Sequence, residues 1–495
     1  MNNLNFLVDV LKESPVFKTL EKNVKPGRTV CASGLSTINK SNIIYALCRL
    51  KGVTAFCLAS DEKEAQTLCN DLSCMGLRAY VYPVRDFNFL DFQSRSHEYE
   101  HARLKVLLKL LNHECDVAIA CVDAAAQLTV PRNVLEQSVI EFEEGKELSL
   151  EKATKALTLL GYERFDAVEG SGQFSLRGGI LDFFMPDSDY PVRCEFWGDE
   201  ITDLSYFDIE TQRRFKKADK ITLSPSTEIV IEDRAALADK IEHKAKLLRS
   251  KNSAKAKEKL FSEAELIRSG AMIANADKFI NQIYDKPESL FDYLDRNTLV
   301  FASEFTAIQE RGKSMDFISN ETLMQGFEDG TLCRGFDRFA LTFNECTEFL
   351  QSHGTIVLEN FVHGSMPIKL SEIISFSTKQ ISAWGGSYKQ LKEDVDGLFT
   401  PESKGVIFAG TERAAKNLCD TFNADGINAV YSEGADKISK GELLVMQGAL
   451  SAGFEYPSQK FFAITYSQVS YRPEKSKKRK KDGTGNLQPF RACPR

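Results

Sequence analysis

The sequence has no apolar run near the roughly 18 residues that a membrane-spanning helix requires, so a transmembrane span is not expected. Its opening stretch, MNNLNFLVDVLKESPVF, has the pattern of an amphipathic helix and lacks the basic, apolar and small-residue segments of a secretory signal. No C-x-x-C pair occurs among the 12 cysteines, and some, such as Cys57 and Cys121, lie inside apolar strand-like runs. We therefore expect reduced, buried thiols and a cytoplasmic location.

The sequence also has no excess of positively charged residues over negatively charged ones. The formal net charge of -7 argues against a protein built mainly to coat nucleic acid, because a basic binding face normally raises the charge of the whole chain. KSKKRKK at 475–481 is a local exception, and DGTGN follows it. Such a block most often forms a disordered linker, and contact with a phosphate backbone or a partner is the alternative. We expect a basic linker or tail over 469–495.

The pattern of strands and helices changes along the 495 residues, a length that suits two to four domains. Short apolar strands alternate with helices over residues 1–134, which predicts a parallel sheet with crossovers. Period-two alternation over 135–225 predicts an inserted antiparallel β-rich domain. Charged helices and an apolar strand over 226–330 form the second part of the first lobe. A second small α/β domain is expected over 335–468.

The stretch from Gly34 to Ser41, GLSTINKS, nearly matches the phosphate-binding loop G-x-x-x-x-G-K-[ST]. It joins the first predicted strand to the first predicted helix, as such a loop must. Asn39 replaces the second glycine, and its side chain would protrude where the backbone normally passes close to phosphate, although Asn tolerates left-handed conformations. Lys40 and Ser41 remain in register. The pattern predicts a degenerate nucleotide site, and weak nucleotide binding stays open.

Hydrolysis of ATP also needs an acidic pair at the end of another strand, to hold magnesium and position water. The best candidate strand is TLVFASEF, which ends in Ser303 and Glu304 where Asp-Glu would be required. A serine cannot supply the missing carboxylate. Two defects in facing halves of one site predict that this portion is not catalytic and holds no cofactor.

HEYEH at 97–101 matches the H-E-x-x-H signature of zinc proteases. On a helix, His97 and His101 would share a face and Glu98 could act as a base. No clear third ligand follows, however, and the segment begins an amphipathic helix. The leucines that form its expected core stripe are Leu104, Leu107, Leu108 and Leu111. A structural role is therefore favoured, and no metal site is expected.

Two arginines and a tryptophan stand out in the β-rich segment. Arg177 lies in LRGGILD, whereas Arg193, Glu195 and Trp197 alternate along one predicted strand and so share a face. Arginine and tryptophan on an exposed face are typical of protein-interface hot spots. The alternative places Trp197 in the core and pairs the arginines with the acidic residues at 199–200.

The segments GQFSLRGGILDFFMP and PVRCEFWGDEITDLSYFDIETQRR, within 172–214, closely resemble the sequence shared by the bacterial transcription-repair coupling factor (Mfd) and the excision-repair protein UvrB. PESLFDYLDRNTLVFASEF resembles the segment before the acidic magnesium motif of UvrB, with Ser303 where UvrB has Asp. The phosphate loop is intact in UvrB and degenerate in the coupling factor. The long Tyr-rich hairpin of UvrB is also missing from YPVRDFNFLDFQSRS. Both departures favour the coupling factor, and a UvrB-like ATP-dependent damage-recognition helicase is the alternative.

The resemblance runs from residue 1 to about 470 and implies an α/β fold. It comprises a degenerate P-loop (RecA/UvrB-like) lobe, an inserted antiparallel β-rich domain that binds UvrA, and a second small α/β domain. It also implies the amino-terminal part of a longer factor that recruits UvrA to stalled RNA polymerase. Contacts with RNA polymerase and DNA, and the motor that uses ATP and magnesium, would belong to carboxy-terminal domains.

The resemblance further implies that Arg177, Arg193 and Trp197 contact UvrA. The family usually has Phe at the position of Trp197, so the ring is kept but enlarged. Glu195 is expected to orient Arg193.

Overall fold

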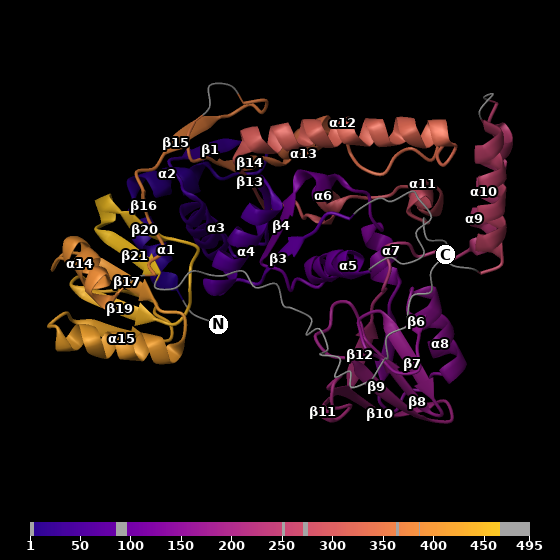
Figure 1. The fold of residues 1–495 in the computed structure, drawn as a ribbon, viewed down its shortest axis with the longest axis horizontal. Helices are drawn as coiled ribbons and strands as arrows, with labels where there is room; N and C mark the ends of the chain where they lie inside the picture. Colours follow the sequence, from indigo (N-terminus) through magenta and orange to yellow (C-terminus); the bar gives the residue numbers. More distant parts are fainter. Residues whose placement is uncertain are drawn as a thin grey trace, which may run out of the picture.

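The computed structural model describes residues 4–85, 97–249, 253–270, 276–362, 366–385 and 387–465 (Figure 1). The expected basic tail at 469–495, with KSKKRKK, lies outside these residues, as does most of YPVRDFNFLDFQSRS. Within the described ranges, no helix combines the length and apolar character needed to cross a membrane.

A seven-stranded, wholly parallel sheet forms the centre of the molecule. We call this sheet, together with the helices that cover it, the lobe. Its strands, in spatial order, are β15 (Glu372–Ser375), β1 (Val30–Ser33), β14 (Thr355–Leu358), β13 (Leu299–Ser303), β2 (Ala55–Ala59), β4 (Val117–Cys121) and β3 (Ala79–Tyr82). Most of these strands are buried along their whole length, because helices cover both faces of the sheet.

Alternate strand residues face two separate cores, as the period of a strand requires. Val30 and Ala32 pack towards one core and Cys31 towards the other. The first core is covered by α1 (Asn5–Lys12), α2 (Pro15–Asn23), α3 (Thr37–Lys51) and α4 (Glu62–Cys74). The second is covered by α5 (Glu98–Leu111), α6 (Val122–Ala126), α12 (Phe305–Asp329) and α13 (Phe343–His353).

The β-rich domain is built around a six-stranded sheet that is antiparallel except where β6 meets β7. Its strands, in spatial order, are β11 (Arg214–Lys217), β10 (Glu200–Phe207), β9 (Val192–Trp197), β8 (Ile180–Phe183), β7 (Gln173–Arg177) and β6 (Glu163–Arg164). A two-stranded sheet of β12 (Lys220–Leu223) and β5 (Ile140–Glu143) adjoins it, and α8 (Leu150–Leu159) contributes to the shared core.

Two tight hairpin turns lie side by side at one end of this sheet. Gly178 and Gly198 begin them with φ of 62° and 64°, the left-handed values that two-residue hairpins favour. Gly179 has no room for a side chain, because a Cβ there would lie 2.7 Å from the carbonyl oxygen of Phe196. The amide of Phe196 also donates to the carbonyl of Gly179, at 2.8 Å. This close backbone contact sets the spacing between the two turns.

A second α/β unit contains a mixed six-stranded sheet and two helices. They are β16 (Lys379–Ile381), β20 (Gly453–Tyr456), β21 (Phe461–Thr465), β17 (Lys404–Phe408), β19 (Glu442–Met446) and β18 (Ala429–Ser432), with α14 (Tyr388–Leu398) and α15 (Glu412–Ala424). The expected range of this unit began at residue 335. The strands at 355–358 and 372–375 instead flank β1 in the lobe, because a parallel neighbour was available there.

Figure 1 shows the β-rich domain and the second α/β unit at opposite ends of the lobe, with α12 running along its upper side. The remaining elements are α7 (Arg132–Gln137), α9 (Arg234–Leu247), α10 (Ser253–Arg268), α11 (Ile280–Ile283) and the short 3-10 helices η1 (Ala276–Phe279), η2 (Leu290–Tyr293) and η3 (Pro457–Gln459). One hydrophobic core joins the lobe to the second unit, since side chains of α1 and α3 share it with those of β20 and β21. The mixed α/β class expected from the sequence is thus confirmed.

Candidate partner-binding site

The predicted face of β9 is present. Val192, Cys194 and Phe196 are buried, whereas Arg193, Glu195 and Trp197 lie on the opposite side of the strand. Trp197 is 82% exposed, so the alternative that placed it in the core is wrong.

Both arginines donate to one buried carboxylate, Asp182 of β8. Arg193 donates two hydrogen bonds to Asp182, from Nε to Oδ1 at 2.7 Å and from Nη2 to Oδ2 at 2.8 Å. Arg177 donates one, from Nη2 to Oδ2 at 2.9 Å. The Asp182 side chain is almost completely enclosed. The arginines are therefore not paired with the acidic residues at 199–200, and we call the surface of Arg177, Arg193 and Trp197 around Asp182 the docking face.

Gln212 and Phe207 complete the enclosure of Arg193. The backbone carbonyl of Gln212 accepts from Nη1 at 3.2 Å, and its side-chain oxygen accepts from Nη2 at 3.1 Å. The guanidinium lies over the ring of Phe207, 4.5 Å from its centroid. The hydrogen bonds with Asp182 raise the pKa of Arg193, so its charge is permanent.

Glu195 does not orient Arg193, contrary to expectation. It pairs with Arg214 of β11, whose Nη1 also donates to Asp203 at 2.9 Å. The reason is register: Asp182 lies directly opposite Arg193 across the β8–β9 pair, whereas Glu195 lies opposite Ile180. The sequence offered a signal for Asp182, because a lone acidic residue in the apolar run ILDFF needs a cationic neighbour when buried.

The phosphate-loop residues lie in a different setting from the one the motif describes. α3 already begins at Thr37, so Asn39, Lys40 and Ser41 belong to its first turns and are buried. Asn39 accepts a hydrogen bond from the hydroxyl of Ser36, at 2.6 Å. Gly34 has φ of 78°, and a Cβ there would overlap the carbonyl oxygen of Phe376.

Lys40 of the phosphate-loop motif lies against Ser303 and Glu304 at the end of β13, as the sequence predicted for the two sides of one site. The Lys40 ammonium donates to Ser303 Oγ at 2.9 Å and to Glu304 at 2.5 Å. Glu64 of α4 approaches the same nitrogen at 3.3 Å and accepts from Ser303 at 2.6 Å. Burial alone would raise the pKa of Glu64, but Lys40 and the hydroxyl of Ser303 outweigh it and lower that pKa. The lysine that would reach phosphate is neutralised by its own chain.

A further carboxylate, Glu359, lies beyond the end of β14. It accepts from the amide of Phe305 at 2.8 Å and is fully buried. Burial, and then the nearby charge of Glu304, raise the pKa of Glu359 to about 7. This acidic group has no counterpart in the motif and was not anticipated from the sequence.

Ser41, at the position where a magnesium ligand would be expected, instead donates to Asp71 of α4 at 3.2 Å. Asp71 also accepts from the amide and the hydroxyl of Ser451, both at 2.7 Å. Burial raises the pKa of Asp71 to about 6. This contact fastens the loop before β20, and hence the second α/β unit, to the lobe.

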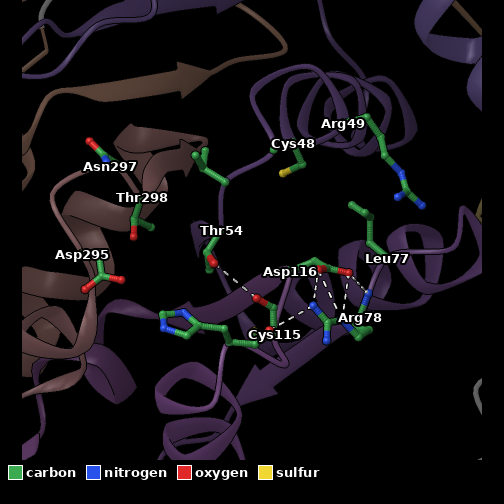
Figure 2. Close-up of a pocket in the computed structure, with 13 residues that line it drawn as sticks. Cys48, Arg49, Thr54, Leu77, Arg78, Cys115, Asp116, Asp295, Asn297 and Thr298 are labelled. Atoms are coloured by element: carbon green, nitrogen blue, oxygen red, sulfur yellow. Dashed lines mark hydrogen bonds and ion pairs between the residues drawn. The ribbon is translucent and has the colours of Figure 1, made fainter.

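Cavities open on the lobe at opposite edges of its sheet. One cavity, of about 470 Å³, lies at the amino ends of the strands. Arg78 pairs with Asp116 at its wall (Figure 2). Ligands of open parallel sheets bind at the carboxyl ends instead. A cavity of about 1120 Å³ lies there, beside Tyr82 and Cys121, but Lys40 and Ser303 do not line it.

The HEYEH segment has a structural role at the junction with the β-rich domain. His97 contacts Glu100 at 2.9 Å, and His101 contacts the hydroxyl of Ser226 at 3.0 Å. Glu100 also accepts from the amide of Glu228 at 2.8 Å. Among the residues described, no group of three His, Cys, Asp or Glu is placed to hold a metal ion.

Comparison with known proteins agrees with the resemblance. Residues 140–229 match the family model described as the UvrB interaction domain. The transcription-repair-coupling factor of Bacillus subtilis is 26% identical over 484 residues, covering 95% of this chain and 41% of the relative. Those of Staphylococcus epidermidis (25% identical; 82% of this chain, 35% of the relative) and Staphylococcus aureus MRSA252 (21%; 99% and 42%) are also similar.

The chain thus spans roughly two fifths of the length of the curated relatives it matches. Over most of its own length, it has the similarity to transcription-repair-coupling factors that its motifs predicted.

Proposed function

We propose that this chain recruits UvrA in transcription-coupled nucleotide excision repair, and that the docking face makes the contact. The observation that carries the proposal is Trp197, which is 82% exposed at the end of β9 and lies on the same strand face as Arg193, while Arg193 and Arg177 are anchored on one buried carboxylate. A large exposed ring next to guanidinium groups is the combination that dominates protein interfaces. It suits a partner surface that offers a carboxylate and an apolar recess.

The other activities of such a factor are proposed to lie elsewhere in the complete protein. We assign RNA polymerase binding, DNA binding and ATP-driven movement with magnesium to parts beyond this chain. The contacts of Lys40 support this assignment, because two carboxylates and a serine already occupy its donors. A UvrB-like helicase would need that lysine for phosphate. DNA-dependent ATP turnover that is abolished by Lys40→Ala would favour the helicase instead.

Isothermal titration against purified UvrA tests the docking proposal. We expect a Kd near or below about 1 μM, corresponding to about 8 kcal/mol of binding free energy. Trp197→Ala, or Arg177→Ala combined with Arg193→Ala, should weaken binding by about tenfold or more. Phe317→Ala on α12 and Arg413→Ala on α15 are controls, because one is an exposed aromatic residue and the other an exposed arginine, and both helices lie away from β9 (Figure 1). Equal binding by the arginine double variant would remove the proposed interface.

A further inference from the structure

The two arginines of the docking face differ in how many hydrogen-bond donors they have left. A guanidinium has five N–H donors. Arg193 uses four: two on Asp182, one on the carbonyl of Gln212 and one on its side-chain oxygen. The hydrogen bond of Arg177 goes to Asp182 and uses a single donor, on Nη2.

Their exposure differs in the same direction. The Arg193 side chain is 14% exposed and lies over the ring of Phe207, whereas that of Arg177 is 51% exposed. A partner can therefore reach most of the Arg177 fork, but only the edge of Arg193.

We infer that Arg193 is a positioning residue rather than a contact residue, and that it acts through Asp182 to hold Arg177 in place on the docking face. The inference rests on the proposed function. It departs from the expectation that both arginines touch the partner. The contact pair is then Arg177, which offers its free donors to a carboxylate, and Trp197, which enters an apolar recess.

The shared carboxylate explains how Arg193 acts at a distance. Asp182 is buried and is satisfied by three charge-assisted hydrogen bonds, two of them from Arg193. Removing Arg193 leaves Arg177 as the charged group bonded to this buried carboxylate, so Arg177 should turn inward to compensate. Its fork would then no longer be pre-organised for the partner, and affinity falls although no contact has been removed.

A double-mutant cycle by titration against UvrA tests the division of roles. Arg177→Ala and Arg193→Ala should each weaken binding by about tenfold, but Arg193→Ala should add less than about twofold in the Arg177→Ala background. Arg193→Lys should be as weak as Arg193→Ala, since an ammonium cannot make the two-pronged contact with Asp182. The inference is overturned if the losses of affinity in Arg177→Ala and Arg193→Ala multiply in the double variant, or if Arg193→Lys binds as well as the wild type. Either result would show direct contact by Arg193. Thermal unfolding of each variant confirms that it is folded.

A measurement on the free protein separates this inference from the proposed function. The chemical shift and relaxation of the side-chain Nε of Arg177 should show a group that is displaced towards Asp182 in Arg193→Ala, compared with the wild type. Arg413→Ala should leave the signal of Arg177 as it is. An unchanged Arg177 in the Arg193→Ala variant overturns the positioning role. If UvrA fails to bind the wild type, the proposed function falls and the relaxation result alone decides the role of Arg193.

Discussion

The lobe and the β-rich domain each contain a basic side chain that bonds to an acidic side chain of the same chain, and the two arrangements differ in how many donors remain for a partner. Lys40 is 1% exposed, and its ammonium is shared among Glu64, Ser303 and Glu304. Arg177 is half exposed and bonds to Asp182 through Nη2. Lys40, a preserved residue of a catalytic motif, thus has its donors occupied by its own chain. Arg177, which belongs to no catalytic motif, keeps donors for a partner.

Removing the charge of Lys40 should have the largest effect on stability. Lys40→Ala leaves Glu64, Glu304 and Glu359 crowded together without their cation, and loss of a buried partner costs about 3–5 kcal/mol of unfolding free energy. Urea denaturation measures the loss, and Lys63→Ala, an exposed lysine on α4, is the control. Arg177→Ala should cost less than about 1 kcal/mol, because its side chain is half exposed. Equal costs would erase the contrast between the two regions.

Gly179→Ala should disturb the docking face with an intermediate effect. The new Cβ would press on the carbonyl oxygen of Phe196, only 2.7 Å away, and relieving such an overlap costs about 1–3 kcal/mol. Because Phe196 precedes Trp197, the ring should shift and UvrA binding should weaken. Gly170→Ala in the same domain is a fair control, since its nearest atom would be 3.7 Å away. Unaltered binding by Gly179→Ala would mean that the turn spacing is not critical.

The smallest expected effect is a pH dependence confined to the lobe. The pKa of Glu359 is about 7 in the folded protein against 4.5 ordinarily, so the folded state holds a proton that the unfolded state releases between these values. This contribution to stability is present below pH 4.5 and is lost as the pH rises through 7. Glu359 should therefore raise the melting temperature as the pH is lowered from about 8 to about 6, whereas the pKa of His101, which burial lowers, acts in the opposite direction. Glu359→Gln should flatten that rise, whereas Glu348→Gln, exposed on α13, should not. A profile unchanged by Glu359→Gln would contradict this assignment.

Much of the fold could be predicted because local patterns determined it. Strand and helix alternation gave the parallel lobe, and period-two alternation placed Trp197 on the open face of β9. The joining of β14 and β15 to β1 could not be predicted, because parallel pairing between strands more than three hundred residues apart leaves no local pattern.

The site was only partly predictable for a related reason. The phosphate-loop motif and the segment that ends in Ser303 predicted that Lys40 and Ser303 lie together. Glu64, whose carboxylate helps to neutralise the charge of Lys40, lies on the next helix and belongs to no motif. Asp182 was overlooked because its apolar neighbours suggested an ordinary buried strand. The hydrogen bonds from Arg193 to Gln212 depend on a backbone φ of 58° at Gln212, and a glutamine in the sequence does not predict such a positive φ.

The bond between Ser41 and Asp71 has a mechanical consequence. In a working phosphate loop, the serine at this position binds the magnesium ion that accompanies the nucleotide. Here the same hydroxyl is tied through Asp71 to Ser451, at the boundary where the second unit shares a core with α3. The hydroxyl that a working loop would give to a metal ion therefore holds two bodies of the chain together.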